Sequence, residues 1–145
     1  MDKGGELMIE CKNVCFSYRS NSEDTEISQN EGTLKNISCS IEDGSFVLLC
    51  GASGCGKTTL RRLFNGLIPH YYEGELTGQV LLDGEECKDL SLFEISEKVG
   101  SVFQNPRSQF FNVDTTSEIA FGPENHGLPE QDIRNRVQQV AEQLN

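Results

Sequence analysis

Long apolar runs are absent from this sequence of 145 residues. A membrane-spanning helix needs about 18 or more consecutive apolar residues, and a secretory signal needs an apolar segment near the N-terminus. Neither pattern occurs, and residues 1–9 contain no such segment. The sequence therefore predicts a soluble, cytoplasmic protein and excludes a membrane-spanning one.

Positive charge is scarce, because 12 Lys and Arg stand against 23 Asp and Glu for a formal net charge of -11. An acidic surface repels polyanions, which argues against nucleic acid or anionic lipid as a general partner. Any anionic ligand would then have to be captured locally. Lys57, Arg61 and Arg62 lie close together in the sequence, and the two arginines either serve that purpose or form a solvated helix face.

Metal-binding cysteine patterns are also missing. The six cysteines include no Cys-x-x-Cys pair and the chain has only two histidines, so no zinc or redox motif is present and reduced thiols are expected. Cys11 and Cys15 share a face of a predicted strand and are expected to be buried or half-buried small hydrophobes. Cys55 differs because it lies in a glycine-rich loop beside Lys57, where alkylation should compete with a ligand of that loop.

That loop is the most informative segment present. The apolar segment 46–50, a predicted buried strand, runs into GASGCGKTT at residues 51–59. Glycines can take positive φ, so successive N–H groups can close around phosphate oxygens, and a helix beginning at Lys57 aims its unpaired N–H groups at the same point. The pattern predicts a phosphate-binding loop, and the flanking strand and helix disfavour the alternative of an ordinary glycine-rich turn.

The polar side chains of the loop have predicted roles. Lys57 would reach the β- and γ-phosphates of a nucleoside triphosphate, and the hydroxyl of Thr58 would bind a Mg²⁺ ion that bridges them. The predicted ligand-binding residues of the loop are Gly51, Ser53, Gly54, Cys55, Gly56, Lys57, Thr58 and Thr59.

The other elements are predicted from hydrophobic periodicity. Alternating residues predict two half-buried antiparallel strands at 7–18 and 34–41, joined by a polar, mobile connection at 19–32. Further predictions are a helix from 57 to about 65, with Gly66 in the left-handed cap position, strands at 76–82 and 99–103, and helices at 90–98, 115–121 and 130–144.

Three features in this order resemble the ATP-binding subunit of an ABC transporter: Tyr18 at the end of the first strand, the loop 51–59, and VFQNP at 102–106. The resemblance implies ATP and Mg²⁺ as cofactors. It also implies that Tyr18 stacks on adenine, with Phe16 as a possible substitute, and that Gln104 contacts Mg²⁺ and the attacking water. A neutral amide suits that role because it can move away without leaving a buried charge. Thr58 and Gln104 are thus the implied metal contacts.

The segments 105–111 and 119–125 resemble the energy-coupling factor branch of that family, the ATPases of vitamin and transition-metal-ion importers. The resemblance implies two partners, a second ATP-binding subunit in a head-to-tail dimer and a transmembrane coupling subunit, and a location at the inner face of the cell membrane. The region around Phe110 and Phe111 would face the coupling subunit, although both could be ordinary core aromatics.

The implied fold is α/β: a P-loop NTPase core, built from a parallel sheet with helices, plus an N-terminal antiparallel β subdomain. Residues 1–145 would form a partial ATP-binding domain. Within it, residues 7–44 are the antiparallel region, 45–104 run from the P-loop to the Q-loop, and 105–145 begin the helical subdomain.

Several motifs of the family do not occur in these residues: the LSGGQ-like signature, a second apolar strand followed by Asp-Glu, and a later histidine. Without that glutamate nothing polarises the attacking water. We therefore expect an N-terminal part of an ATPase domain, lacking its C-terminal part, that binds ATP without hydrolysing it alone and contains no catalytic residue of its own. The strand at 46–50 would then be an open apolar edge.

Three functions remain open from the sequence. The first is the ATPase component of an importer, and the second is a non-catalytic nucleotide-binding or interaction module. The third, a small-molecule kinase, is disfavoured because it would need neither Tyr18 nor Gln104 and has no reason to carry antiparallel strands before the loop.

Overall fold

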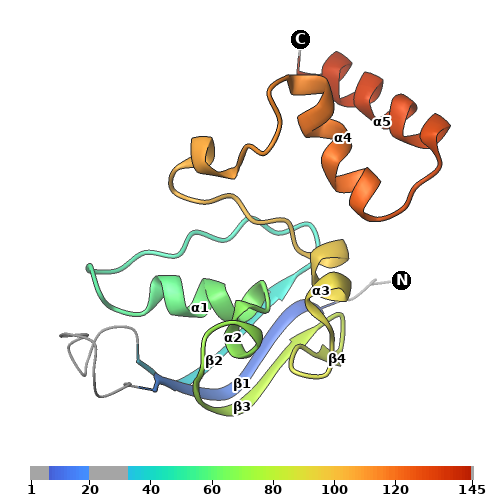
Figure 1. The fold of residues 1–145 in the computed structure, drawn as a ribbon. Helices are drawn as coiled ribbons and strands as arrows, with labels where there is room; N and C mark the ends of the chain where they lie inside the picture. Colours follow the sequence, from blue (N-terminus) through green and yellow to red (C-terminus); the bar gives the residue numbers. More distant parts are fainter. Residues whose placement is uncertain (1–6, 20–32, 145) are drawn as a thin grey trace. The chain divides into compact units, whose positions relative to one another are not determined.

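The computed structural model describes residues 7–19 and 33–144, which form two compact units, Met1–Ser101 and Val102–Asn145 (Figure 1). The first unit combines a sheet with short helices, and the second is helical. Most of the predicted connection at 19–32 lies outside the described residues. None of the described helices is long and apolar enough to cross a bilayer.

A four-stranded sheet, antiparallel throughout, builds the first unit. Its spatial order is β2 (Leu34–Glu42), β1 (Leu7–Tyr18), β3 (Gly74–Leu82) and β4 (Glu85–Glu86). The predicted antiparallel pair at the N-terminus is confirmed. The strand predicted at 76–82 begins two residues earlier and joins the same sheet beside β1.

Three short helices pack onto this sheet: α1 (Lys57–Phe64), α2 (Leu67–His70) and α3 (Leu92–Lys98). Each supplies one fully buried apolar side chain to the core, namely Leu63, Ile68 and Ile95. The sequence predicted α1 well, including Gly66 in the left-handed region at φ +71°. It did not predict α2, whose four residues include Pro69.

The predicted helix 90–98 begins two residues later because Ser91 caps it. The Ser91 hydroxyl accepts from the N–H of Glu94, and the Glu94 carboxylate accepts from the N–H of Ser91 at 2.7 Å. This reciprocal pair satisfies two groups that would otherwise be unpaired at the helix end.

The two buried strands predicted at 46–50 and 99–103 are wrong. Neither segment forms a strand, and Phe46, Leu48 and Val102 are 94%, 76% and 77% exposed. A strand requires a neighbour that pairs with its backbone, and no strand among the described residues pairs with either segment. The described residues therefore form no parallel sheet, whereas the mixed α/β class with an N-terminal antiparallel region is confirmed.

The second unit contains a short 3₁₀ turn (Pro106–Gln109) and the helices α4 (Thr115–Asn125) and α5 (Glu130–Gln143). Helix α4 extends four residues beyond its predicted end and includes Pro123. The apolar side chains of Ile133, Val137 and Val140 on α5 are half-buried, but Leu144, the last residue of the predicted helix 130–144, lies beyond α5 and is 80% exposed.

Candidate phosphate-binding site

The glycine-rich loop leads from the exposed segment 46–50 into the first turn of α1. Gly54 and Gly56 adopt φ values of +77° and +95°, which L-residues rarely adopt. At Gly56 a Cβ atom would also lie 2.8 Å from Leu34 Cδ2 on β2. The predicted need for glycine is confirmed at these two positions, and it is both conformational and steric at Gly56.

The ammonium group of Lys57 folds back over this loop. It donates hydrogen bonds to the carbonyl oxygens of Gly51 at 2.8 Å and Ala52 at 2.6 Å, and it lies 3.6 Å from Cys55 Sγ. These neutral acceptors hold the side chain in place without neutralising its charge. An anion that enters the loop would find a cation already in position.

Unpaired backbone N–H groups lie at the same place. Gly56 is the N-cap of α1 and offers no capping side chain. Within residues 7–19 and 33–144, the N–H groups of Gly54, Lys57 and Thr58 donate to no backbone carbonyl. A helix N-terminus carries partial positive charge, so these groups and the Lys57 ammonium together fit an anion such as a phosphate. The exposed hydroxyl of Thr58 is available to a Mg²⁺ ion on that phosphate.

The side chain of Thr59 has a different environment, because it is 2% exposed and turns toward Tyr18. Its hydroxyl lies 3.2 Å from the Tyr18 hydroxyl, in a hydrogen bond that either group can donate. The structure thus connects two of the predicted site residues directly, although they are 41 positions apart in the sequence.

Arg62 makes a contact that the sequence did not predict. Its Nη1 donates to the Tyr18 hydroxyl at 2.8 Å, and its guanidinium carbon lies 3.9 Å from the centre of the Tyr72 ring. Arg62 is therefore half-buried against aromatic rings, whereas Arg61 is exposed. The spacing of Thr59 and Arg62 could have indicated this contact from the sequence, because residues three apart in a helix lie on the same face.

The two candidate adenine-stacking rings, Phe16 and Tyr18, differ in burial. Phe16 is 1% exposed and belongs to the core, so its ring has no free face for a base. Tyr18 is half-buried and keeps part of its surface accessible. Tyr18 is therefore the ring that the structure leaves available.

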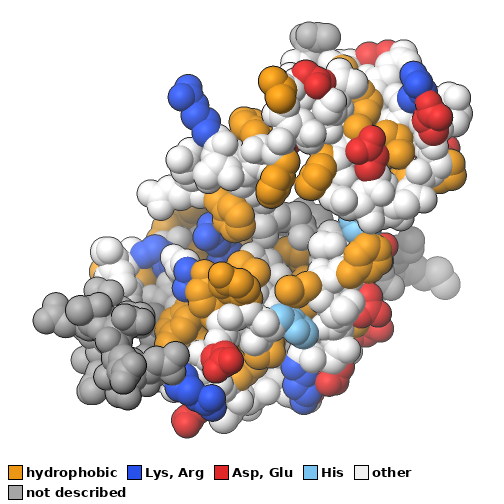
Figure 2. All heavy atoms as spheres, viewed as in Figure 1, with side chains coloured by type: hydrophobic (Ala, Val, Ile, Leu, Met, Phe, Trp, Pro, Cys, Tyr) orange, Lys and Arg blue, Asp and Glu red, His pale blue; other side chains and the backbone are white. Residues whose placement is uncertain are grey.

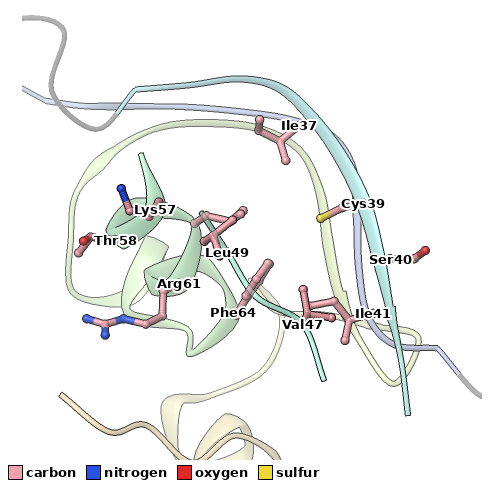
Figure 3. A pocket seen from close by; sticks show the side chains of 11 residues that line it. Ile37, Cys39, Ser40, Ile41, Val47, Leu49, Lys57, Thr58, Arg61 and Phe64 are labelled. Atoms are coloured by element: carbon pink, nitrogen blue, oxygen red, sulfur yellow. The ribbon is translucent and has the colours of Figure 1, made fainter. Parts of the chain in front are cut away.

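An apolar groove of about 690 Å³ adjoins the loop between β2, the segment 46–50 and α1 (Figure 3). Lys57 and Thr58 lie toward one end of it, and Ile41 and Val47 lie toward the other. Most of its lining side chains are apolar, and Lys57 and Thr58 supply polar groups at one end. The groove is lined by Ile37, Cys39, Ser40, Ile41, Val47, Leu49, Lys57, Thr58, Leu60, Arg61 and Phe64.

The thiols differ in environment. Burial is the main cause that raises the pKa of the Cys11 thiol from its ordinary value of 9.0 to about 12, and neighbouring Cys39 is the second cause. Burial likewise raises the pKa of Cys87 to about 11. Cys15 is half-buried and Cys55 is exposed. The expectation that Cys11 and Cys15 behave as buried or half-buried hydrophobes is confirmed.

In the second unit, Gln104 is exposed, and its contact with Mg²⁺ stays a prediction. Phe110 and Phe111 are 63% and 75% exposed, so the alternative that they are core aromatics is wrong. Phe111 stacks on Phe121 with ring centres 5.0 Å apart. Apolar side chains are visible at the surface of both units (Figure 2).

Comparison with known proteins decides the family. The family described as ABC transporter matches residues 34–145, which include the whole loop and α1. The chain belongs to the ABC transporter family. This membership accounts for a phosphate-binding loop that follows an antiparallel β region.

Relatives of this ABC transporter chain carry the name putative ABC transporter ATP-binding protein. One from Treponema denticola is 50% identical over 137 residues, which are 94% of this chain and 26% of that protein. One from Methanosarcina acetivorans is 40% identical over 138 residues, 95% of this chain and 20% of its own length. The chain thus spans about a quarter of the length of the first relative and less of the second.

Proposed function

We propose that this chain is the ATP-binding component of an ABC importer and that it binds Mg-ATP in the loop before α1. The observation that carries the proposal is the Lys57 ammonium, held over the loop by two neutral carbonyls beside the unpaired N–H groups of α1. A triphosphate would accept hydrogen bonds from all of these donors. Bound Mg²⁺ would neutralise phosphate charge, with Thr58 as one contact.

The remaining residues have proposed roles at the two ends of the nucleotide. Tyr18 stacks on the adenine ring, because of the two candidate rings, Phe16 and Tyr18, it is the one that keeps part of its surface accessible. Ser53, Gly54 and Cys55 supply loop backbone to the phosphates. Gln104 provides the second contact to Mg²⁺ and its water, as the resemblance to the family's Q-loop suggests.

The transport function rests on the resemblance of segments 105–111 and 119–125 to the energy-coupling factor branch. We propose that residues 7–44 are the antiparallel region, 45–104 the nucleotide-binding core and 105–145 the beginning of a helical subdomain. The proposed cargo class is vitamins or transition-metal ions, which the ATP-binding subunit itself does not select.

The proposed partners are a second ATP-binding subunit, head to tail, and a transmembrane coupling subunit at the cytoplasmic face of the membrane. Exposed aromatic side chains at Phe110 and Phe111 support a protein partner for the second unit. The acidic net charge of -11 gives no support to a nucleic-acid partner.

Calorimetric titration with Mg-ATP tests the proposal. We expect saturable binding by the unaltered chain and no measurable binding by Lys57→Ala, because the substitution removes the fixed cation and its hydrogen bonds to phosphate. Lys35→Ala, which removes an exposed lysine from β2, is the matched control and should bind normally. Unchanged affinity in Lys57→Ala would overturn the site.

Phosphate release separates the importer component from a non-catalytic nucleotide-binding module. The 145 residues contain no Asp-Glu pair after an apolar strand, so we expect binding without turnover when the chain is alone. Turnover that appears only when another ATP-binding subunit is added would support a working half-site. Binding that never leads to turnover with such a partner would favour the module.

A further inference from the structure

We propose that Arg62 is a positioning residue for the nucleotide base, because it holds the Tyr18 ring at a fixed place relative to the phosphate-binding loop. The inference rests on the proposed function, in which Tyr18 stacks on adenine. It adds a role for a side chain that touches neither the phosphates nor the base.

Two side chains of helix α1 hold the Tyr18 hydroxyl. Thr59 Oγ1 lies 3.2 Å away and Arg62 Nη1 lies 2.8 Å away. One turn of α1 separates these two residues, so both side chains approach the hydroxyl from one helix face. Because Arg62 can only donate, the hydroxyl accepts from it and remains free to donate to Thr59.

Arg62 is itself held in place by aromatic rings. Its guanidinium carbon lies 3.9 Å from the centre of the Tyr72 ring, a cation–π contact, and 5.9 Å from the centre of the Tyr18 ring. Tyr72 and Tyr18 meet edge to face with centres 6.1 Å apart. A planar guanidinium can stack on one ring and donate in its plane to a second group, which an ammonium cannot reproduce.

The Tyr18 ring also packs against the core of the sheet. Tyr18 meets Phe16 edge to face with ring centres 4.8 Å apart, and Phe16 is 1% exposed in the core. The Tyr18 ring is therefore fixed at its hydroxyl by α1 and at its side by the core of the sheet. A ring held at two points cannot rotate freely about its side-chain bonds.

These contacts connect the two ends of the proposed nucleotide site through one helix. The first turn of α1 carries Lys57 and Thr58 at the phosphate end, and its second turn holds the ring at the base end. A ring already in position avoids the entropic cost of ordering it when the nucleotide binds. Arg62 should therefore contribute to the affinity for ATP but not to the affinity for triphosphate alone.

The test compares Mg-ATP with Mg-bound inorganic triphosphate by calorimetry in the full chain and its variants. The readout is the dissociation constant for triphosphate divided by the dissociation constant for ATP. This ratio reports how much the base contributes to affinity. We expect Arg62→Met and Tyr18→Phe each to lower this ratio by about threefold to fivefold, the scale of one aromatic stacking interaction. Tyr18→Ala marks the full loss of the base contribution. Thermal melts confirm that each variant is folded.

Two further measurements separate positioning from a general structural effect. The double variant Tyr18→Phe/Arg62→Met should lower the ratio no more than either single change, because both remove the same contact. Arg61→Met, the same substitution one residue earlier, should leave the ratio unchanged. The fluorescence of etheno-ATP, which stacking quenches, should be quenched less in Arg62→Met than in the unaltered chain.

The outcomes distinguish this inference from the proposed function. One outcome is that Tyr18→Ala abolishes the preference for ATP, whereas Arg62→Met keeps this preference or lowers the affinity for both ligands equally. Arg62 is then not a positioning residue, and the assignment of the nucleotide site stands. If the unaltered chain binds both ligands equally, the base site is wrong and the inference fails with it. If it binds neither ligand, the phosphate site and the proposed function fail as well.

Discussion

At the scale of single residues, the cysteines show how strongly local environment differs within one small unit. Cys11 and Cys87 are buried, Cys15 is half-buried, and Cys39, Cys50 and Cys55 are exposed. A thiol reacts as its thiolate, so accessibility and pKa together determine which of them can be modified. The six thiols therefore act as separate reporters of the core and of the loop.

Cys55 reports on the loop. Its sulfur lies 3.6 Å from the Lys57 ammonium, so an alkyl group there would occupy the space that a phosphate needs. We expect saturating Mg-ATP to slow alkylation of Cys55 by N-ethylmaleimide while the rate at Cys39 on β2 stays the same. Mass spectrometry of labelled peptides measures both rates in one sample, and equal labelling of Cys55 with and without nucleotide would contradict the phosphate site.

Cys11 and Cys87 report on the core through pH. Their pKa values are raised by burial to about 12 and about 11, from an ordinary value of 9.0. Between pH 9 and the raised values the unfolded chain loses protons that the folded chain keeps, so the free energy of unfolding falls as pH rises above about 9.

Melting temperatures between about pH 8 and pH 11 measure this effect. Cys11→Ala should flatten the decline, because it removes the thiol with the larger shift, at the cost of some core packing at every pH. Cys50→Ala, an exposed thiol, serves as the control and should leave the slope unchanged. A slope equally steep in Cys11→Ala would show that other groups cause it.

Among the helices, the backbone N–H groups at the N-terminus differ in their hydrogen-bond acceptors. Helix α3 begins with the reciprocal pair Ser91 and Glu94, and in α4 the Asp114 carboxylate accepts from the N–H of Ser117 at 2.9 Å. Helix α1 has Gly56 as its N-cap, and glycine has no side chain to cap the helix. The N–H groups at the start of α1 thus remain available to a ligand, whereas in α3 and α4 a capping side chain accepts from one N–H group of the first turn.

Helix α4 also holds the segment that precedes it. One oxygen of the Glu118 carboxylate accepts from the N–H of Phe111 at 3.1 Å, the N–H of Asn112 at 2.8 Å and Asn112 Nδ2 at 3.2 Å. Glu118→Ala should release these donors and accelerate hydrogen exchange at the Phe111 and Asn112 amides, without increasing exchange in α5. Glu124→Ala, an exposed carboxylate on the same helix, is the control, and identical exchange in both variants would contradict the role of Glu118.

At the scale of the whole molecule, each unit leaves apolar side chains exposed. In the first unit these include Phe46, Val47 and Leu48, and in the second they include Phe110 and Val113, which is fully exposed. Scattered apolar residues are normal at protein surfaces, but consecutive ones form patches that bind other apolar groups. The segment 46–49 is the longest such run in the first unit.

This segment gives a prediction for the isolated 145-residue chain. We expect the dye ANS to bind it with increased fluorescence, and the double variant Phe46→Ser/Leu48→Ser to reduce that signal while the melting temperature changes little, because both side chains are exposed. Leu144→Ser removes a single exposed apolar residue and should reduce the signal much less. Absence of dye binding by the unaltered chain would contradict the exposure of 46–49.

The local features of this protein follow from its amino-acid sequence. The loop 51–59, the helix that begins at Lys57 and the alternating strands 7–18 and 34–41 depend on residues that are close in the chain, so their patterns can be recognised without knowledge of their neighbours in space. The pairing of segments depends instead on the tertiary fold. Apolar composition predicted strands at 46–50 and 99–103, but a strand exists only where a partner completes its hydrogen bonds, and β3 rather than either segment lies beside β1. The contact of Arg62 with Tyr18 likewise joins residues 44 positions apart, and only the packing of α1 on the sheet brings them together.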